Sequence, residues 1–238
     1  MRQVIVCLVL IGLFAAPVDA CIGARYAGLG WCGVAIADGP EASYWNPAAF
    51  AWARDGVMYG SIFGSKDFAA KYGNWGVHYV QDWDKWYSGI GYGFQIENNM
   101  AIGFNLGWCS YNDEYYNHIS EIPFLDISFI YKQGNFVYGT LLQNIVNVRP
   151  EVAYITDYIT ITAGFYDLVN LSSIFYEESF HNFHMGIELR LNSFLALRGG
   201  YNSKYDRLLY GVGLVFKHCK IDLVNIDDEI YFTFTFVQ

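Results

Sequence analysis

Bulky apolar residues alternate with glycine, polar or charged residues in short segments from about residue 56 to the end of the chain. Successive side chains of a β-strand point to opposite faces, so this pattern predicts a sheet with one apolar face and one polar face. The last segment shows the pattern best: Ile230, Phe232, Phe234 and Phe236 fall on one face, and Tyr231, Thr233 and Thr235 fall on the other.

Thirteen segments are strand candidates by this alternation. They are 56–63, 74–82, 87–96, 99–110, 123–132, 135–143, 156–166, 168–177, 181–191, 194–202, 206–217, 219–226 and 229–237. Single-chain bacterial outer-membrane barrels have an even number of strands. We therefore expect fourteen strands, with twelve as the alternative.

Charged residues keep to the polar face of these segments: Asp126, Lys132, Glu188, Arg190, Arg198, Lys220 and Asp222. A lysine or arginine that faced lipid at the bilayer midplane would cost about 2–4 kcal/mol. The sequence therefore predicts an all-β fold, a transmembrane antiparallel β-barrel over residues 56–238 whose apolar exterior touches outer-membrane lipid. The alternative is a secreted β-sandwich, which also buries one face of each sheet.

Composition agrees with a barrel and excludes one class of partner. Aromatic residues make up 19% of the chain and charged residues only 16%, whereas a soluble globular domain carries about 25% charged residues. Tyrosine and tryptophan suit the aromatic girdles at the two membrane interfaces. The net charge of −9 argues against nucleic acid as a partner, because phosphate binding needs a basic surface.

The N-terminus carries an export signal. Arg2 precedes the apolar run 4–16, and small residues near Ala20 suit cleavage there, so residues 1–20 are expected to be a removed signal peptide. Cys21 would then be the first mature residue and the place for a lipid anchor; ordinary cleavage beside Cys21 is the alternative. Cys21 and Cys32 could also form a disulfide, which spacing alone does not decide.

Residues 21–55 differ from the strand region and are expected to form a plug. The segment is rich in glycine and alanine, and it contains Asn46, Pro47 and Ala48. Asn46 suits the N-cap of a short helix, and Pro47 suits its first position. A compact segment of small residues fits inside a barrel lumen. The alternative is an extension that lies across one mouth.

The stretch 23–50 resembles the opening of a known family. It reads Gly-Ala-Arg-Tyr-Ala-Gly-Leu-Gly and, further on, Ala-Ile-Ala-Asp and Tyr-Trp-Asn-Pro-Ala-Ala-Phe. This resembles the PorV/PorQ family and, more distantly, the FadL-type fatty-acid transporters; residues 186–236 also resemble the family. The resemblance implies a fourteen-stranded outer-membrane barrel whose N-terminal segment enters the lumen. In FadL-like members that segment gates hydrophobic molecules, which would make Asn46, Pro47 and Ala48 the hatch motif. PorV-like members act with a protein secretion system.

Few residues are candidates for other chemistry. His181 and His184 lie three apart, but on a strand they face opposite sides, so we expect no metal site. No catalytic or phosphate-binding motif appears, and we expect neither an enzyme nor a cofactor. Four lumen charges form a candidate cluster: Glu188 and Arg190 on one strand, Arg198 on the following strand, and Asp222 two strands further on. They are expected to pair into a ladder that stiffens the wall; a polar constriction that selects solutes is the alternative.

These inferences predict an exported barrel of the bacterial outer membrane without catalytic activity. The leading function is passage or binding of hydrophobic small molecules, with the N-terminal segment as gate. The first alternative is a scaffold or shuttle component for secretion-system proteins. The second is a closed structural barrel with no open path. The ligand, the pore diameter and the oligomeric state do not follow from the sequence.

Overall fold

The computed structural model describes residues 23–62, 65–82, 85–113, 118–143, 147–166, 169–170, 182–203, 205–226 and 229–238. The expected signal peptide, its cleavage position, Cys21 and His181 lie outside these ranges. Among the described residues, no helix has the length and hydrophobicity needed to cross a membrane.

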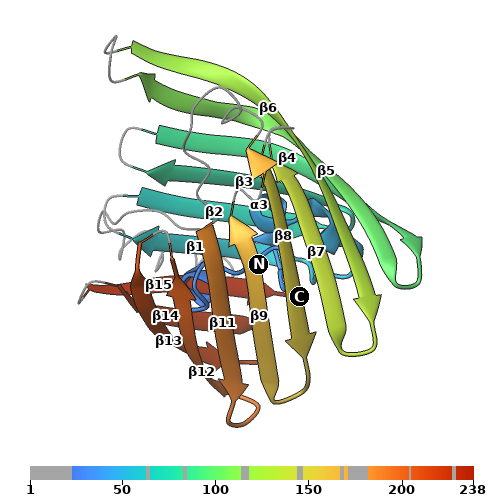
Figure 1. Cartoon of the computed structure of the whole chain (residues 1–238), viewed down its shortest axis with the longest axis vertical. Helices are drawn as coiled ribbons and strands as arrows, with labels where there is room; N and C mark the ends of the chain where they lie inside the picture. Colours follow the sequence, from blue (N-terminus) through green and yellow to red (C-terminus); the bar gives the residue numbers. More distant parts are fainter. Residues whose placement is uncertain are drawn as a thin grey trace, which may run out of the picture.

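The described chain is a single antiparallel sheet that closes into a barrel (Figure 1). Its strands are β1 Gly56–Ile62, β2 Ser65–Tyr72, β3 Trp75–Asp82, β4 Lys85–Glu97, β5 Met100–Asp113, β6 His118–Gln133, β7 Phe136–Gln143, β8 Asn147–Ile155, β9 Ile159–Tyr166, β10 Val169–Asn170, β11 Asn182–Arg190, β12 Leu195–Asn202, β13 Arg207–Val215, β14 Cys219–Ile226 and β15 Glu229–Val237.

Apart from β10, the strands pair in sequence order, with β9 next to β11, and the first and last strands complete the ring. β1 pairs with β15, with Gly56 opposite Val237. The two-residue β10 pairs with β8, which is also the partner of β9. β9 and β10 therefore occupy one strand position, and the barrel has fourteen strands. This confirms the predicted fold and strand number, and it excludes the β-sandwich.

Two strands were not predicted, and one predicted segment does not occupy a strand position of its own. The segments β2 and β8 were not predicted as strands, and 168–177 was predicted as a strand of its own. The structure describes only Val169–Asn170 of that segment. They form β10, which pairs with β8 on the same side as β9. In β2, Asp67 and Lys71 are buried on the inner face, and β8 contains Pro150. Charged residues and proline both weaken a strand signal.

The two faces of the wall have the predicted character. On β15, Tyr231, Thr233 and Thr235 are buried inside. On the outside, large apolar side chains stay exposed, such as Ile90, Leu106, Trp108, Leu208 and Tyr210, which are 50–78% exposed. The barrel therefore has an apolar exterior and an enclosed interior.

Six turns of two to four residues lie at one end of the barrel, which we call the short-turn rim. They are 73–74, 98–99, 134–135, 156–158, 191–194 and 216–218. Gly73 and Gly134 each have a φ of 59°, a conformation that two-residue hairpin turns favour and glycine adopts at no steric cost. Gln238 donates its backbone N–H to Asp55 at the same rim, so the barrel starts and ends there.

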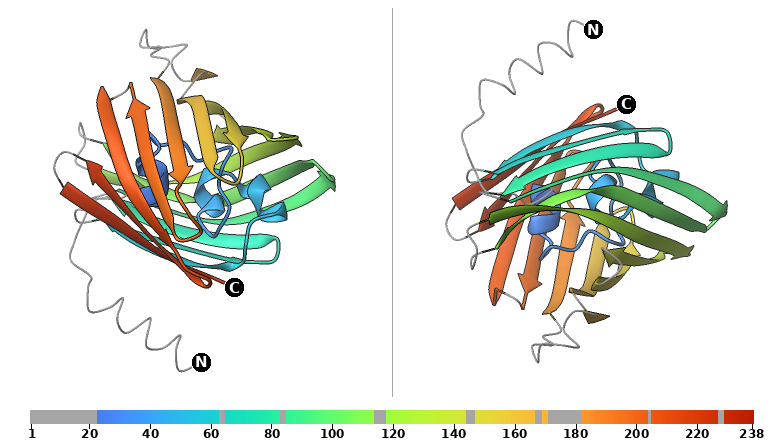
Figure 2. Two further views of the ribbon diagram at one scale, coloured as in Figure 1. Left: turned by 90° about the horizontal axis from the view of Figure 1, so that it is seen from below. Right: turned by 90° about the horizontal axis from the view of Figure 1, so that it is seen from above.

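Residues 23–55 run through the interior of the barrel, and we call them the plug (Figure 2). The plug contains two short helices, α2 Ala24–Ala27 and α3 Ala42–Trp45, and the 3₁₀-helix η1 Pro47–Ala51. Most of its side chains are buried, and the largest of the fully buried ones, Trp45, Tyr26 and Phe50, are about 1% exposed. The hydrophobic core of the molecule is thus the contact between the plug and the inner wall.

Candidate functional site

Two of the predicted hatch residues, Pro47 and Ala48, pack against glycines of the wall strands. A Cβ atom at Gly93 would overlap the carbonyl of Pro47, and a Cβ at Gly103 would overlap the backbone N–H of Ala48. Gly76 and Gly91 lie under the ring of Phe50 in the same way. We call these four glycines of β3, β4 and β5 the glycine seat. Their alternation with apolar residues, visible in the sequence, removes the side chains that would keep the plug away from the wall.

Asn46 holds η1 in place by hydrogen bonds in two directions. Its side-chain oxygen accepts from the Ala48 backbone N–H at 3.0 Å, which is an N-cap, and Pro47 follows at the first helical position. Its amide nitrogen donates to the carbonyls of Val34 at 2.7 Å and Phe129 at 3.3 Å. Asn46 is fully buried, so it joins two parts of the plug to the wall strand β6.

The four predicted lumen charges lie within ion-pair distance of one another. Arg198 contacts Glu188 at 2.7 Å and Asp222 at 2.7 Å, and Arg190 contacts Glu188 at 3.2 Å. Glu188 and Arg198 are register partners on β11 and β12. Glu188, Arg198 and Asp222 are buried, whereas the Arg190 side chain is 41% exposed. Strands β11, β12 and β14 therefore carry a ladder of alternating charge, and Arg198 reaches Asp222 across Gly213 of β13.

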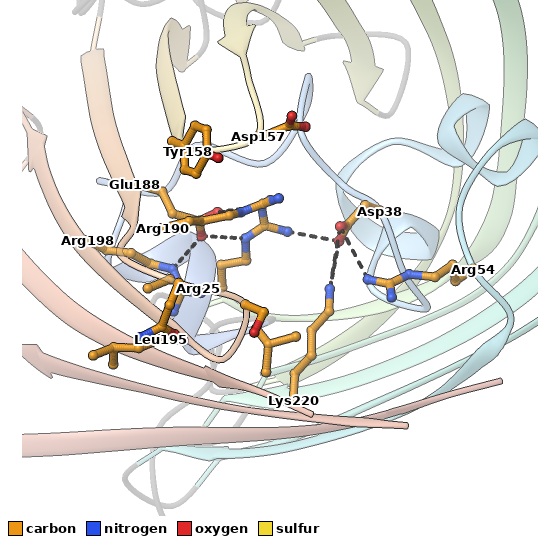
Figure 3. Close-up of a pocket in the computed structure, with 14 residues that line it drawn as sticks. Arg25, Asp38, Arg54, Asp157, Tyr158, Glu188, Arg190, Leu195, Arg198 and Lys220 are labelled. Atoms are coloured by element: carbon orange, nitrogen blue, oxygen red, sulfur yellow. Dashed lines mark hydrogen bonds and ion pairs between the residues drawn. The ribbon is translucent and has the colours of Figure 1, made fainter. Parts of the chain in front are cut away.

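A plug residue that the sequence analysis did not include completes this cluster. Arg25 donates to both carboxylate oxygens of Glu188, at 3.1 and 3.3 Å, and to Asp38 at 2.9 Å (Figure 3). Asp38 also contacts Lys220 at 3.2 Å and Arg54 at 3.8 Å. We call this series of contacts the ion chain. It runs Arg190–Glu188–Arg25–Asp38–Arg54, and Arg198, Asp222 and Lys220 pair with its members from the side.

The charges of the ion chain change the titration of the plug. Burial opposes ionisation of Asp38, but the charges of Lys220, Arg25 and Arg54 outweigh it and hold the pKa of this carboxyl well below its usual range. Nearby Glu41 behaves in the opposite way, because burial and then the charge of Asp38 raise its pKa. Asp38 therefore stays ionised at neutral pH. Arg25 and Asp38 are both part of the stretch that carries the family resemblance, which was the available signal for them.

Glu151 on β8 is a third anchor of the plug. Its carboxylate accepts the backbone N–H groups of Gly33, Val34 and Ala35 at 2.9–3.1 Å and the Thr162 hydroxyl at 2.8 Å. Successive backbone N–H groups that point to one carboxylate form an anion-binding nest. Nothing in the sequence pattern pairs Glu151 with a segment more than a hundred residues away.

Cys32 and His184 lie beside this carboxylate. One ligand-type atom from each of Cys32, Glu151 and His184 lies within 4.8 Å of the other two, and all three residues are buried. Glu151 already accepts four hydrogen bonds, so the arrangement is better explained as an anchor than as a metal centre. Cys32 forms no disulfide with any described cysteine, and burial raises the pKa of its thiol.

Two cavities open between the plug and the wall near the short-turn rim. The larger one, of about 500 Å³, lies along the ion chain and is drawn in Figure 3. The smaller one, of about 290 Å³, lies beside η1 and is lined mainly by apolar side chains, among them Ile36, Trp52, Ile130, Val137 and Ile155. Lys132 borders it, with its Nζ 4.0 Å from the centre of the Trp52 ring. Asp38 lines both cavities.

Comparison with known proteins supports the fold and leaves the sequence family open. No family model and no curated protein matches the sequence. The solved structure of a "CymD monoaromatic hydrocarbon channel" superposes with a TM-score of 0.64 at 9% identity, covering 94% of this chain and 99% of that one. A "TodX monoaromatic hydrocarbon channel deltaS2 mutant" superposes with a TM-score of 0.52 at 11% identity, covering 90% and 96%. The barrel with its inner segment is thus a fold that known channels also have.

Proposed function

We propose that this chain is an outer-membrane barrel of the FadL type that binds hydrophobic small molecules or lets them pass, with the plug as its gate. The observation that carries this proposal is the apolar cavity between η1 and the wall. Its volume of about 290 Å³ is close to the lower end of the range for small-molecule sites. It has the two features expected of such a site, a mainly apolar lining and a few polar groups, here Asp38, Lys132 and Asn135.

Three further features support the proposal. The exterior of the wall is apolar and rich in exposed aromatic side chains, as a lipid-facing surface requires. The short-turn rim carries both ends of the barrel, as the periplasmic rim of such barrels does. The fold is similar to that of two structures described as hydrocarbon channels. Export with cleavage after Ala20, a lipid anchor on Cys21 and the absence of catalysis remain predictions.

A neutral hydrophobic dye tests the proposed route. Cells whose outer membrane excludes N-phenylnaphthylamine should take it up faster when they make this barrel. Replacing Ala53, which lines the apolar cavity, by tryptophan should fill the cavity and slow the uptake. Ala70→Trp is the matched control, because Ala70 lies on the outer face of β2 next to exposed Phe68 in the alternation.

Two results would contradict the proposal. One is dye entry at the same rate with and without the barrel, and the other is equal entry in the Ala53→Trp and Ala70→Trp variants. The scaffold alternative predicts instead that removing residues 23–52 abolishes co-purification of secretion-system proteins and leaves dye entry unchanged. Heated and unheated samples on a denaturing gel verify that each variant forms a folded barrel before uptake is compared.

A further inference from the structure

The larger cavity has a chemistry that passage of neutral molecules does not need. It is built by three parts of the molecule: the plug, the turns of the short-turn rim and the wall strands β11 to β14. Its lining includes five cationic side chains, Arg25, Arg54, Arg190, Arg198 and Lys220, and three acidic ones, Asp38, Asp157 and Glu188. The chain as a whole carries a net charge of −9, so this cavity is a local reversal of sign.

The buried charges of the ion chain are already paired with one another. Glu188 pairs with Arg25 and Arg198, and Asp38 pairs with Arg25 and Lys220. Arg198 also contacts Asp222 on the inner face of the wall. These contacts leave the interior of the cluster close to neutral. The surplus of positive charge therefore lies with the two residues at the ends of the ion chain, Arg54 and Arg190.

Both end residues keep hydrogen-bond donors for another partner. The side chain of Arg190 is 41% exposed and contacts Glu188 through Nε, and the side chain of Arg54 is 48% exposed and contacts Asp38 through one terminal nitrogen. Neither Nη atom of Arg190, nor the Nε or other Nη of Arg54, has a hydrogen bond or ion pair with any residue that the structure describes. Guanidinium groups with free donors bind carboxylates in a fork geometry.

The rest of the lining provides an apolar surface beside these donors. Leu195, Ala196 and Val215 line the cavity from the wall, and the ring of Tyr158 stands at its edge (Figure 3). Tyr158 is held there because its carbonyl accepts the backbone N–H of Arg190 at 2.7 Å. A ligand in this cavity would therefore meet cationic donors on one side and an apolar or aromatic surface on the other.

We propose that this cavity is a second binding site, open at the short-turn rim, for the carboxylate of a small organic acid with an apolar body. Arg190, the end residue whose backbone contacts Tyr158, binds the carboxylate through its Nη atoms, while Arg25, Arg54 and Lys220 supply the surrounding positive field. Tyr158, Leu195 and Val215 contact the apolar body. The site shares only Asp38 with the apolar cavity beside η1, and its proposed ligand is tested without reference to the passage of neutral molecules.

Fluorine NMR of para-fluorobenzoate with the purified full barrel in a neutral detergent at low salt tests this site. The probe should titrate to one site, and its affinity should fall about tenfold or more in the Arg54→Gln/Arg190→Gln double variant, since each charge-assisted hydrogen bond contributes substantially to affinity. Arg207→Gln is the matched control, because Arg207 is an exposed arginine at the start of β13, at the opposite rim, and its loss should leave the affinity unchanged.

Two further probes test whether binding requires both a carboxylate and an apolar body. The neutral isostere para-fluorobenzamide should not compete, and inorganic phosphate should compete much more weakly than benzoate because it cannot use the apolar surface. Equal binding of the amide, equal competition by phosphate, or the same affinity in the double variant and in Arg207→Gln would each overturn the proposal. Dye entry into cells is measured separately, so the two proposals can fail independently.

Discussion

The plug is fixed to the wall in two different ways at its two ends. Around Pro47, Ala48 and Phe50 it lies on the glycine seat, where the wall has no side chains and contact runs from backbone to backbone. Around Arg25 and Asp38 it is held by the ion chain, through long side chains from both partners. The first contact depends on shape alone, and any added atom is a clash. The second depends on charge, and its outer members Arg54 and Arg190 are partly exposed.

Removal of Glu188 should have the largest effect, and it should act on the ion-chain end of the plug. The Glu188→Gln variant leaves Arg25 and Arg198 without their shared carboxylate, and breaking a buried pair in this way costs about 3–5 kcal/mol. Asp38 and Asp222 still contact the two arginines, which places the loss at the lower end. Native-state hydrogen exchange should show faster exchange in residues 24–38 than in 46–51.

The matched control for this variant is Glu97→Gln, which removes one exposed acidic charge at the end of β4. It should change local stability by less than about 0.5 kcal/mol. If Glu188→Gln left exchange in residues 24–38 unchanged, the ion chain would not hold the plug. If both ends of the plug opened to the same extent, the plug would move as one body and the comparison would lose its basis.

A side chain in the glycine seat should have the next largest effect, at the other end of the plug. In Gly103→Val the new side chain overlaps the backbone of Pro47 and Ala48, and overpacking of this kind costs about 1–3 kcal/mol. Gly199→Val is the control, because a Cβ at Gly199 meets only the side chain of Ile187, at 3.8 Å. Exchange should accelerate in residues 46–51 for Gly103→Val and remain unchanged for Gly199→Val; similar exchange in the two variants would contradict the steric explanation.

The alternation of residues along the strands and the helix-cap residues were sufficient to predict several contacts of the plug and the wall. Alternation along β4 and β5 placed Gly91, Gly93 and Gly103 on the inner face, and that is the face on which the plug lies. Alternation also placed Glu188 and Arg198 on adjacent strands, which the register makes direct neighbours. Asn46 and Pro47 showed the start of a short helix, and the helix that forms is a 3₁₀-helix with Asn46 as its cap.

Contacts between the plug and distant strands could not be predicted in this way. Glu151 binds the backbone of residues 33–35, and backbone N–H groups carry no sequence signal. Arg25 and Asp38 meet Glu188 and Lys220 only because the plug folds into the closed barrel. The strand β8 was missed for a related reason, since its inward Glu151 and its Pro150 interrupt the apolar pattern. These contacts form only in the folded barrel, where the plug supplies the backbone partners of Glu151.

The ion-chain end of the plug should respond to pH, and the glycine-seat end should not. Asp38 has a lowered pKa in the folded protein, so its stabilising contribution is present above the ordinary pKa of about 3.9 and is lost as the pH falls below it. Glu41 has a raised pKa, so its contribution is present below its ordinary pKa of about 4.3 and is lost as the pH rises through the folded value.

These two opposite contributions give residues 24–38 a maximum of protection in the acidic range, between protonation of Asp38 and ionisation of Glu41. Residues 46–51 carry no ionisable side chain and should show no such maximum. The effect should be smaller than that of either substitution above, because the Asp38 side chain is 40% exposed and solvent screens its charge. Hydrogen exchange corrected for the intrinsic pH dependence of the amide rate measures it. Asp38→Asn should remove the acidic side of the profile, and Glu41→Gln should remove the alkaline side. A profile that keeps both sides in these variants would assign the titration to other groups, and the contrast between the two ends of the plug would then rest on shape alone.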